Sequence, residues 1–426
     1  MKHVKLRILD EANCVFVGLT EEHLEYFRDD LSAYAPNYFF NPKYKLGSWD
    51  GKIRYFSPTG KTYVHLLPKI LPKIKALGYS IQLEDLRANT KDIPDADIHE
   101  DCWSHVNDTD SGEPIKLRYY QVDAANAIIE NGGGIVIAGT GARKTLINGV
   151  LVDKYGQLGY KTITIVPSQD LIKQTANDFI AWGLDTGEFS GKRKDLDHLH
   201  IVSTWQTLQN TPAVLQQFGV VVVDECHGLK GKVLGSLLND HGKNIAFRFG
   251  LTGTLPKEVA DVMAVHTAVG YPQYEIAAHE LIAQDFLAKL HIDVVQLQED
   301  FRGQYEKYLA DHADNPVGSF AVEKPLTYNK FKEALYPDYP AEKSYIRTHN
   351  SERMEWIAMY IEAKRDMGKG NVFCLVDSIR FGKKLATLIP DAHFVYGKDE
   401  QAARKEIYDL FKDNDNVVAI ATVNIA

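Results

Sequence analysis

The chain has 426 residues, of which 45% are hydrophobic and 25% are charged, which is ordinary for a globular protein of about three domains. The formal net charge of −9 does not exclude nucleic acid as a partner, because an average hides how the charges are distributed. No apolar run reaches the ~18 residues of a membrane span, and the four cysteines are scattered. We therefore expect a cytoplasmic protein without a membrane partner or a disulfide framework.

Residues 1–83 are predicted to form a small α+β domain with a helix capped by Thr20. From Leu31 to Leu83 eight basic residues face one acid, Asp50, and aromatic residues are interleaved among them. Positive charge combined with aromatic rings suits contacts with phosphates and stacking on bases. The domain is therefore predicted to bind DNA through Lys43, Lys45, Trp49, Lys52 and Arg54. The alternative is a solvated strand face over a small core.

Residues 84–114 are predicted to be a linker, because they contain few apolar residues and several residues that break regular structure. Ten acids face two bases there, so this segment carries −8 and the rest of the chain is close to neutral. His99, Cys102 and His105 have the spacing of zinc ligands, but no fourth ligand follows at a suitable distance. A polar linker with an incidental cysteine is the favoured interpretation.

From residue 115, short apolar segments alternate with helical patterns, which predicts a parallel, doubly wound sheet. Ligands of such sheets bind beyond the carboxyl ends of the strands. The expected strands are 135–138, 162–166, 199–203, 220–223 and 247–251, and the expected helices are 121–130, 146–155, 169–182, 205–209 and 234–239.

The segment from Gly132 to Thr145, GGGIVIAGTGARKT, has the order strand, glycine turn, Lys-Thr and helix that a phosphate-binding loop requires. Lys144 supplies a mobile cation, and the hydroxyl of Thr145 can bind Mg²⁺. Arg143 stands where the pattern G-x-x-x-x-G-K-[ST] has glycine. If that position needs φ > 0, a Cβ there costs roughly 1–2 kcal/mol, so we expect nucleotide binding to survive and hydrolysis to be less certain.

An apolar strand, 220–223, delivers two adjacent carboxylates, Asp224 and Glu225, to the same edge of the sheet. An aspartate at a strand end can hold Mg²⁺, and the next glutamate can orient or deprotonate the water that attacks a γ-phosphate. Such a pair is weak evidence alone, but it becomes strong in the same sheet as a phosphate loop.

Further segments follow in a fixed order around these two motifs. Gln121 precedes the loop and can read the edge of adenine with both groups of its amide. Hydroxyl and amide side chains at later strand ends suit sequence-independent contacts with a sugar-phosphate backbone. These later residues are Ser168, Thr204, Gln206, Thr252 and Thr254. Each segment alone is better explained as a capped turn, so the interpretation depends on their joint order.

This ordered set resembles the superfamily 2 helicases over roughly residues 115–426. The matching motifs are Gln121, Thr140-Gly141…Lys144-Thr145, Asp224-Glu225-Cys226-His227 and Thr252-Gly253-Thr254. The segment FNP-K-Y-K-LGSWDGKIRYF is similar to the N-terminal domain of the UvsW-type bacteriophage recombination helicases. The resemblance implies two RecA-like domains, 115–275 and 276–426, behind the small α+β domain. It also implies an ATP-dependent helicase that acts on branched DNA (forks, Holliday junctions, D-loops or R-loops, hence RNA–DNA hybrids as well) in phage recombination, replication and repair.

The resemblance also implies roles for individual residues, with ATP and Mg²⁺ as cofactors. Lys144 would grip the β- and γ-phosphates, Thr145 and Asp224 would hold Mg²⁺, and Glu225 would serve as the base. Thr252, Gly253 and Thr254 would couple hydrolysis to domain movement, and Ser168, Thr204 and Gln206 would lie along the DNA. The residues expected to bind ATP are Arg118, Gln121, Thr140, Gly141, Ala142, Arg143, Lys144 and Thr145.

After about Tyr271 a second αβ unit is expected, in which residues 299–350 have no assignment. Its expected helices are 351–367, 379–388 and 400–411, and its expected strands are 371–376, 393–396 and 417–421. The sequence ends at Ala426, before the Q-x-x-G-R-x-x-R motif of the helicases that it resembles, so we expect a truncated second domain and weak hydrolysis. We expect a monomer, in the host cytoplasm if the gene belongs to a phage. Two alternatives remain open: a non-catalytic DNA-binding or annealing protein, and the motor subunit of a restriction-nuclease system.

Overall fold

The computed structural model describes residues 2–87, 91–108, 112–228, 231–287, 294–297, 301–313, 327–335, 351–367, 370–397, 406–407, 409–411 and 413–422. Contacts between Cα atoms divide the chain into two compact units, Met1–Leu290 and His291–Ala426. The domain boundaries expected from the sequence stay predictions. None of the described helices has the length and apolar character needed to cross a membrane.

The N-terminal part of the first unit contains a mixed sheet of four strands in the order β5-β2-β1-β6. Strands β1 and β2 are antiparallel, whereas β1 and β6 are parallel. Thr20 caps α1 as expected, because its side chain accepts a hydrogen bond from the backbone N–H of His23. A separate two-stranded hairpin, β3–β4, lies between α1 and β5. The elements are β1 (Lys2–Ile8), β2 (Asn13–Val17), α1 (Glu21–Asp30), β3 (Ser32–Tyr34), η1 (Tyr38–Phe40), α2 (Pro42–Lys45), β4 (Lys52–Arg54), β5 (Lys61–Tyr63), α3 (Leu67–Ala76) and β6 (Tyr79–Asp85).

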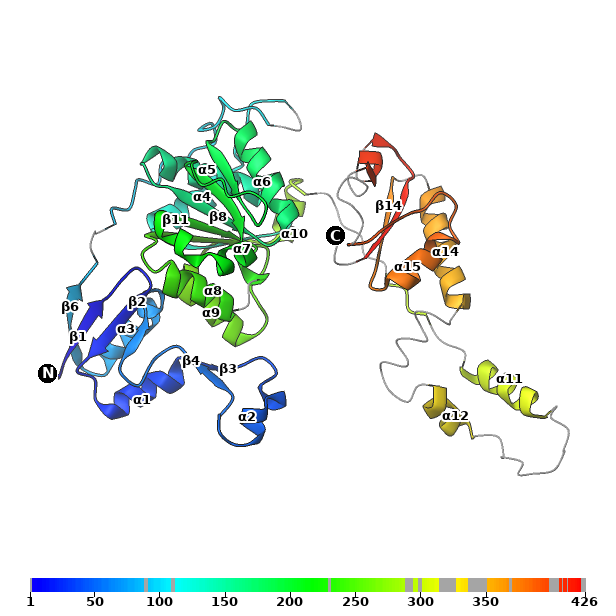
Figure 1. Cartoon of the computed structure of the whole chain (residues 1–426), viewed down its shortest axis with the longest axis horizontal. Coiled ribbons are helices and arrows are strands. Elements are labelled where there is room, and N and C mark those ends of the chain that lie inside the picture. The colour runs from blue at the N-terminus through cyan, green and yellow to red at the C-terminus, as the bar shows by residue number, and fades with distance from the viewer. Residues whose placement is uncertain are drawn as a thin grey trace. The chain divides into compact units, whose positions relative to one another are not determined.

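The rest of the first unit is built on a seven-stranded sheet in the order β13-β7-β12-β11-β8-β10-β9, and each neighbouring pair is parallel. Helices α4, α5 and α6 cover one face, whereas α7, η5 and α9 cover the other (Figure 1). The strands are β7 (Gly133–Ala138), β8 (Thr162–Val166), β9 (Thr186–Phe189), β10 (His200–Thr204), β11 (Val220–Asp224), β12 (Phe247–Thr252) and β13 (Pro272–Ile276). The helices are α4 (Tyr119–Glu130), α5 (Lys144–Gln157), α6 (Gln169–Ala181), α7 (Trp205–Asn210), α8 (Gly231–Leu234), the π-helix η5 (Gly235–His241), α9 (Val259–Val269) and α10 (Ala278–Ala283).

The predicted parallel α/β fold is confirmed, and all five expected strands of this sheet are present within one or two residues. Strands β9 and β13 are not among the expected elements, and neither are helices α9 and α10. The helix expected at 234–239 is present: α8 ends at Leu234, and the π-helix η5 continues from Gly235 to His241.

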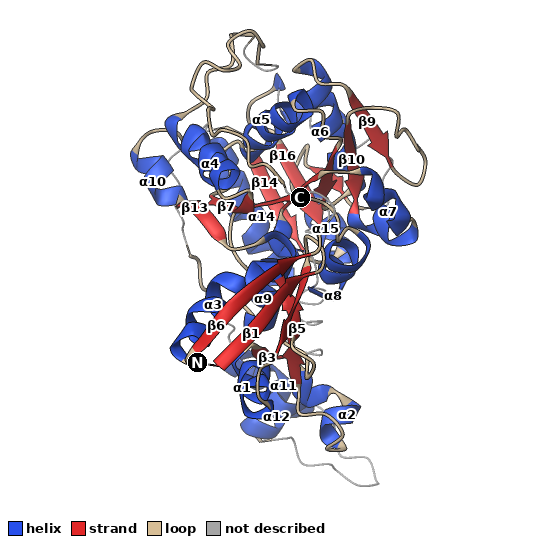
Figure 2. Cartoon of the chain, turned by 90° about the vertical axis from the view of Figure 1, so that its left-hand side faces the viewer, coloured by secondary structure: helices blue, strands red, loops and turns tan. Residues whose placement is uncertain are grey.

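Helix α9 joins the parallel sheet to the N-terminal domain, where it packs against β3 and the 3-10 turn Val64–Leu66 (Figure 2). Three of its residues, Ala260, Met263 and Ala264, belong to the apolar core of that domain. The hydroxyl of Tyr55 donates to the carbonyl of Ala260 at 2.6 Å, and Nδ1 of His65 lies 3.1 Å from the carbonyl of Thr267.

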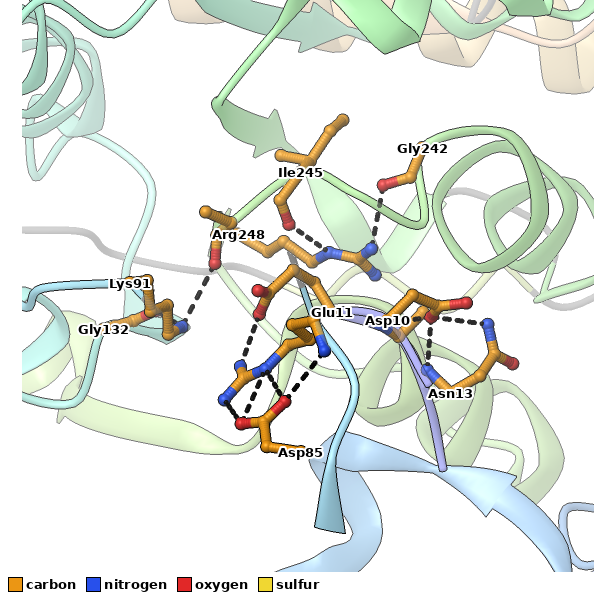
Figure 3. A network of polar contacts seen from close by, with 12 residues as sticks. Asp10, Glu11, Asn13, Asp85, Lys91, Gly132, Gly242, Ile245 and Arg248 are labelled. Carbon is orange, nitrogen blue, oxygen red and sulfur yellow. Dashed lines mark hydrogen bonds and ion pairs between the residues drawn. The ribbon is translucent and has the colours of Figure 1, made fainter. Parts of the chain in front are cut away.

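A polar network reinforces this junction around Arg248, a fully buried arginine at the start of β12 (Figure 3). Its guanidinium donates to the carbonyls of Ile245, Gly242 and Ala268, at 3.2, 2.9 and 3.3 Å. Burial lowers the pKa of Arg248 to about 10, while the negative charge of Glu11 opposes that shift. Both parts of the first unit therefore share one buried interface, since Glu11 belongs to the turn between β1 and β2.

The second unit contains a three-stranded parallel sheet in the order β14-β16-β15. Its last strand in sequence, β16, is central and fully buried, as the apolar run at 417–421 predicted. The elements are α11 (Phe301–Ala313), α12 (Tyr328–Leu335), α14 (Ser351–Asp366), β14 (Val372–Val376), α15 (Ile379–Ala386), β15 (His393–Val395) and β16 (Val418–Thr422). The expected helix 400–411 and the last motif residues, 423–426, fall largely or wholly outside the described residues.

Candidate nucleotide-binding site

Three neighbouring strands bring the predicted motifs together. Strand β12 lies between β7 and β11, with Thr252 opposite Ile137 and Leu251 opposite Asp224. Because the strands are parallel, the loop after β7, the pair after β11 and the Thr-Gly-Thr segment after β12 share one edge of the sheet. Gly253 approaches the loop closely, since a Cβ there would lie 3.9 Å from Nζ of Lys144.

The loop after β7 has the backbone geometry of a tight turn into a helix. Gly141 has φ = 86° and Arg143 has φ = 54°, so both adopt the left-handed conformation. Helix α5 begins at Lys144, which places the first helical N–H groups at the end of the turn. The condition stated for Arg143 is therefore met: its Cβ occupies a position that favours glycine.

The side chain of Arg143 is engaged by the acidic segment that precedes the sheet. Its guanidinium lies 2.9 Å from a carboxylate oxygen of Asp108, whose side chain is 13% exposed. Both residues line a cavity of about 220 Å³, together with Thr145. The contact with phosphate that the sequence suggested for Arg143 would have to compete with this ion pair.

A chain of polar contacts links the loop to the other two motifs. Nζ of Lys144 lies 3.4 Å from one carboxylate oxygen of Glu225, and the other oxygen lies 3.2 Å from Nδ1 of His227. The same Nδ1 lies 2.7 Å from the hydroxyl of Thr252. Because that hydroxyl donates to the carbonyl of Thr254 at 2.7 Å, it accepts its hydrogen bond from His227.

Asp224 lies beside this chain in a less hydrated position. Burial raises its pKa to about 6, and the charge of Glu225 acts in the same direction. The backbone N–H of Glu225 donates to Asp224 at 3.0 Å. A cation at this carboxylate would favour its charged form, so its chemistry fits Mg²⁺. Among the described residues no group of three His, Cys, Asp or Glu side chains is arranged to hold a metal, so phosphate and water oxygens would complete such a site.

A cavity of about 830 Å³ opens beside the loop, which is ample for a nucleotide. Its lining combines the three strand-end motifs with residues from β13 and α10. The lining residues are Ile137, Gly139, Thr140, Glu225, His227, Gly253, Thr254, Glu275, Ile276, Ala277, Ala278, Ile282 and Leu287.

Gln121 is fully engaged inside the protein rather than facing this cavity. Its carbonyl accepts from the backbone N–H of Arg118 at 2.9 Å, and its amide donates to the carbonyl of Ala142 at 3.2 Å. Gln121 thus fixes the phosphate loop to the start of α4, and reading adenine would require it to exchange these partners. The guanidinium of Arg118 stacks 4.9 Å from the ring centre of Phe286.

The residues predicted to contact DNA divide into exposed and engaged ones. Ser168 and Gln206 are exposed at the carboxyl ends of the neighbouring strands β8 and β10, and the hydroxyl of Ser168 also caps α6 by accepting from the backbone N–H of Leu171. Thr204 is buried and caps α7, where its hydroxyl accepts from the backbone N–H of Thr207. The hydroxyl of Thr204 therefore supports the turn, and its contact with DNA stays a prediction.

The basic residues of the N-terminal domain also differ from one another. Lys43 and Lys45 are exposed and make no ion pair with any described residue. Lys52 lies 3.4 Å from Asp29, and Arg54 is paired with Asp50. The half-buried Trp49 donates its indole N–H to the carbonyl of Lys52 at 3.0 Å.

Four residues at the site received no role from the sequence: Asp108, His227, Phe286 and Leu287. The spacing of the Asp-Glu-Cys-His motif pointed to His227, but only the fold shows that it joins Glu225 to Thr252. Leu287 covers the loop, since its Cδ2 would lie 2.7 Å from a Cβ on Gly141. No local pattern distinguishes Asp108, Phe286 or Leu287 from ordinary linker residues.

Comparison with known proteins gives two family matches. Residues 3–84 match the family described as "DNA helicase UvsW, N-terminal", and residues 114–257 match "Type III restriction enzyme, res subunit". The chain is 26% identical to the ATP-dependent DNA helicase uvsW of Enterobacteria phage T4 over 96% of its own length and 79% of that protein. It is 24% identical to the DNA 3'-5' helicase XPB of Mycobacterium tuberculosis, over 64% of its length and 46% of that protein.

Solved structures agree with these matches. A crystal structure of the UvsW helicase of bacteriophage T4 aligns with 64% of the chain and 99% of its own length, at a TM-score of 0.56 and 25% identity. A second crystal structure of T4 UvsW covers the whole chain and 81% of its own length, also at a TM-score of 0.56, but at 22% identity it supports the fold alone.

Proposed function

We propose that this chain, a superfamily 2 helicase that resembles UvsW of phage T4, couples ATP hydrolysis to the remodelling of branched DNA. The observation that carries the proposal is the contact chain Lys144–Glu225–His227–Thr252. It connects a phosphate-binding loop, a candidate base and a coupling segment at one edge of the sheet.

The residues of the site would divide the work of ATP hydrolysis among them. The N–H groups of the loop from Thr140 to Thr145 would bind the phosphates at the start of α5. Lys144 would leave Glu225 for the β- and γ-phosphates, since its side chain is only 10% exposed and already lies at the loop. Thr145 and Asp224 would hold Mg²⁺, which neutralises charge on the phosphates.

Release of Lys144 would prepare Glu225 to act as the base. The carboxylate would keep its contact with His227, which orients it, and would no longer be paired with the ammonium of Lys144. His227 would carry the change to Thr252 and Thr254, because it donates to the hydroxyl of Thr252. A change at the phosphate site would thereby alter the hydrogen bonds of Thr252–Thr254, the segment predicted to drive domain movement.

DNA would lie across the same edge of the sheet and reach the N-terminal domain. Ser168 and Gln206 offer polar groups at two neighbouring strand ends, and Lys43 and Lys45 offer exposed positive charge. The contacts would be independent of sequence, since they suit the sugar-phosphate backbone. Forks, Holliday junctions, D-loops and R-loops are the proposed substrates, and a monomer in the cytoplasm is the proposed working form.

ATPase and strand-separation assays on forked, four-way and RNA–DNA substrates test this proposal. We expect turnover that DNA stimulates and strand separation that requires ATP, both lost in Lys144→Ala. DNA binding or annealing without ATP turnover would favour a non-catalytic protein. Metal-dependent cleavage of the strands would favour the alternative function, the motor subunit of a restriction-nuclease system. The match of residues 114–257 to "Type III restriction enzyme, res subunit" names this class.

A further inference from the structure

The segment from Tyr34 to Trp49, here called the aromatic tip, exposes an unusual amount of apolar surface. Phe40 is 67% exposed, Phe39 50% and Leu46 82%. The tip follows β3 and precedes β4, at the end of the first unit away from the parallel sheet (Figure 1). Soluble proteins seldom expose neighbouring rings in this way unless something binds them.

The aromatic rings of the tip pack against one another in a defined arrangement. Tyr38 is central: its ring lies 4.6 Å from that of Tyr34 in a stack and 4.8 Å from that of Tyr44 at 87°. Phe39 and Phe40 lie 4.4 Å apart at the outer side. Gly51 permits this packing, because it has φ = 82° and a Cβ there would come within 2.6 Å of the Tyr38 ring. The half-buried Tyr38 thus supports Phe39, whose ring centre lies 5.7 Å from its own.

The charge around the tip favours a nucleic acid over an apolar protein partner. Between Tyr34 and Trp49 the chain has two lysines, Lys43 and Lys45, and no acid. The adjacent acid, Asp50, is already paired with Arg54. Exposed rings next to unneutralised positive charge are complementary to bases attached to phosphates.

We propose that Phe39 and Phe40 stack on unpaired bases at a DNA branch point while Lys43 and Lys45 contact the neighbouring phosphates. Base faces are accessible only where bases are unstacked, so the rings would discriminate single-stranded arms and branch points from continuous duplex. This inference rests on the proposed function and specifies which DNA feature the N-terminal domain recognises.

Fluorescence anisotropy of the full chain on a single strand, a fork and a blunt duplex of equal length tests the proposal. Loss of stacking weakens binding by roughly fivefold to 150-fold per base. We expect F39A/F40A to lose at least fivefold on the fork and the single strand but not on the duplex. F39W/F40W should retain binding, and Leu83→Ala, which removes another exposed apolar side chain of the domain, is the matched control.

A second measurement needs no variant. A 2-aminopurine base placed at the unpaired position next to the fork should lose fluorescence when the unaltered protein binds, because stacking quenches it. An equal loss on all three DNAs, an unchanged F39A/F40A variant, or an unquenched base would overturn the proposal. If the unaltered chain lacked DNA-stimulated ATPase, the proposed function would fail instead, and the binding series would still decide the role of the tip.

Discussion

The guanidinium of Arg143 lies 2.9 Å from the carboxylate of Asp108, so the acidic segment before the sheet contacts the phosphate loop directly. Arg143 adopts φ = 54° immediately before helix α5. The loop therefore combines a conformation that glycine favours with an anchor that glycine could not provide.

Arg143→Gly should raise ATP turnover severalfold, because it removes a Cβ that costs roughly 1–2 kcal/mol in the left-handed conformation and opens the path to the phosphates. Steady-state ATPase assays at saturating DNA measure the change. Asp108→Asn is the matched control, since it breaks the ion pair but leaves the backbone of residue 143 unaltered. Turnover in the glycine variant equal to or below that of the unaltered chain would contradict the expectation.

Glu225→Gln should lower kcat by about 10²–10⁴-fold, the usual contribution of a positioned general base. Nucleotide affinity should change little, because the glutamine keeps the size of the side chain and Lys144 remains available. Turnover and the binding of a fluorescent ATP analogue separate the two effects. A parallel loss of affinity and turnover would mean that Glu225 mainly shapes the loop.

Lys43→Ala with Lys45→Ala should reduce the dependence of log K on log[salt] by about two, because each lost phosphate contact lowers the slope by about one. Lys52→Ala with Arg54→Ala removes the same charge but should change the slope less, since both side chains already face carboxylates. Binding to duplex DNA between low and moderate salt gives both slopes. Equal slopes for the two double variants would show that ion pairing within the protein does not decide which residues bind.

The stability of the first unit should fall as the pH drops below about 6.5. Burial lowers the pKa of His65 to about 3, while an unfolded chain would have the ordinary value near 6.5. Between these values only the unfolded state binds the proton, so the free energy of unfolding decreases by up to about 1.4 kcal/mol per pH unit. Above pH 6.5 both states are neutral at this residue and the effect vanishes.

Denaturant titrations from pH 7.5 to 4.5 measure this dependence. His65→Gln should flatten it, because glutamine can still donate to the carbonyl of Thr267 but does not titrate. A variant with an unchanged pH profile would place the proton uptake on other groups, such as His266, whose pKa burial lowers to about 4.

The sequence predicted the inner part of the large sheet better than its edges. Strands β8 and β11 are buried on both faces, so each is made almost wholly of apolar or β-branched residues. The two missed strands, β9 and β13, are the two edges of the sheet. They contain glycine, proline and charged residues, because an edge strand is neither fully covered nor fully paired.

At the site, the order of the motifs along the chain was predictive, whereas the individual side-chain contacts were not. The order of motifs predicted that Lys144, Glu225 and Thr252 meet, since carboxyl ends of neighbouring parallel strands share an edge. It did not predict that the side chain of Gln121 is hydrogen-bonded to the backbone of Arg118 and Ala142. Nor did it predict the ion pair between Asp108 and Arg143. Such pairings join residues distant in sequence and depend on the orientation of each side chain in the folded chain.

Arg248 and Thr252 stand near opposite ends of one strand, β12, and this gives the N-terminal domain a direct mechanical route to the nucleotide. At about 3.3 Å per residue, the four steps between them span roughly 13 Å of extended backbone held by neighbours on both sides. One end is fixed in the buried interface, and the other accepts the hydrogen bond of His227. A shift of the N-terminal domain at Arg248 would thus reach the hydroxyl of Thr252 along a single strand.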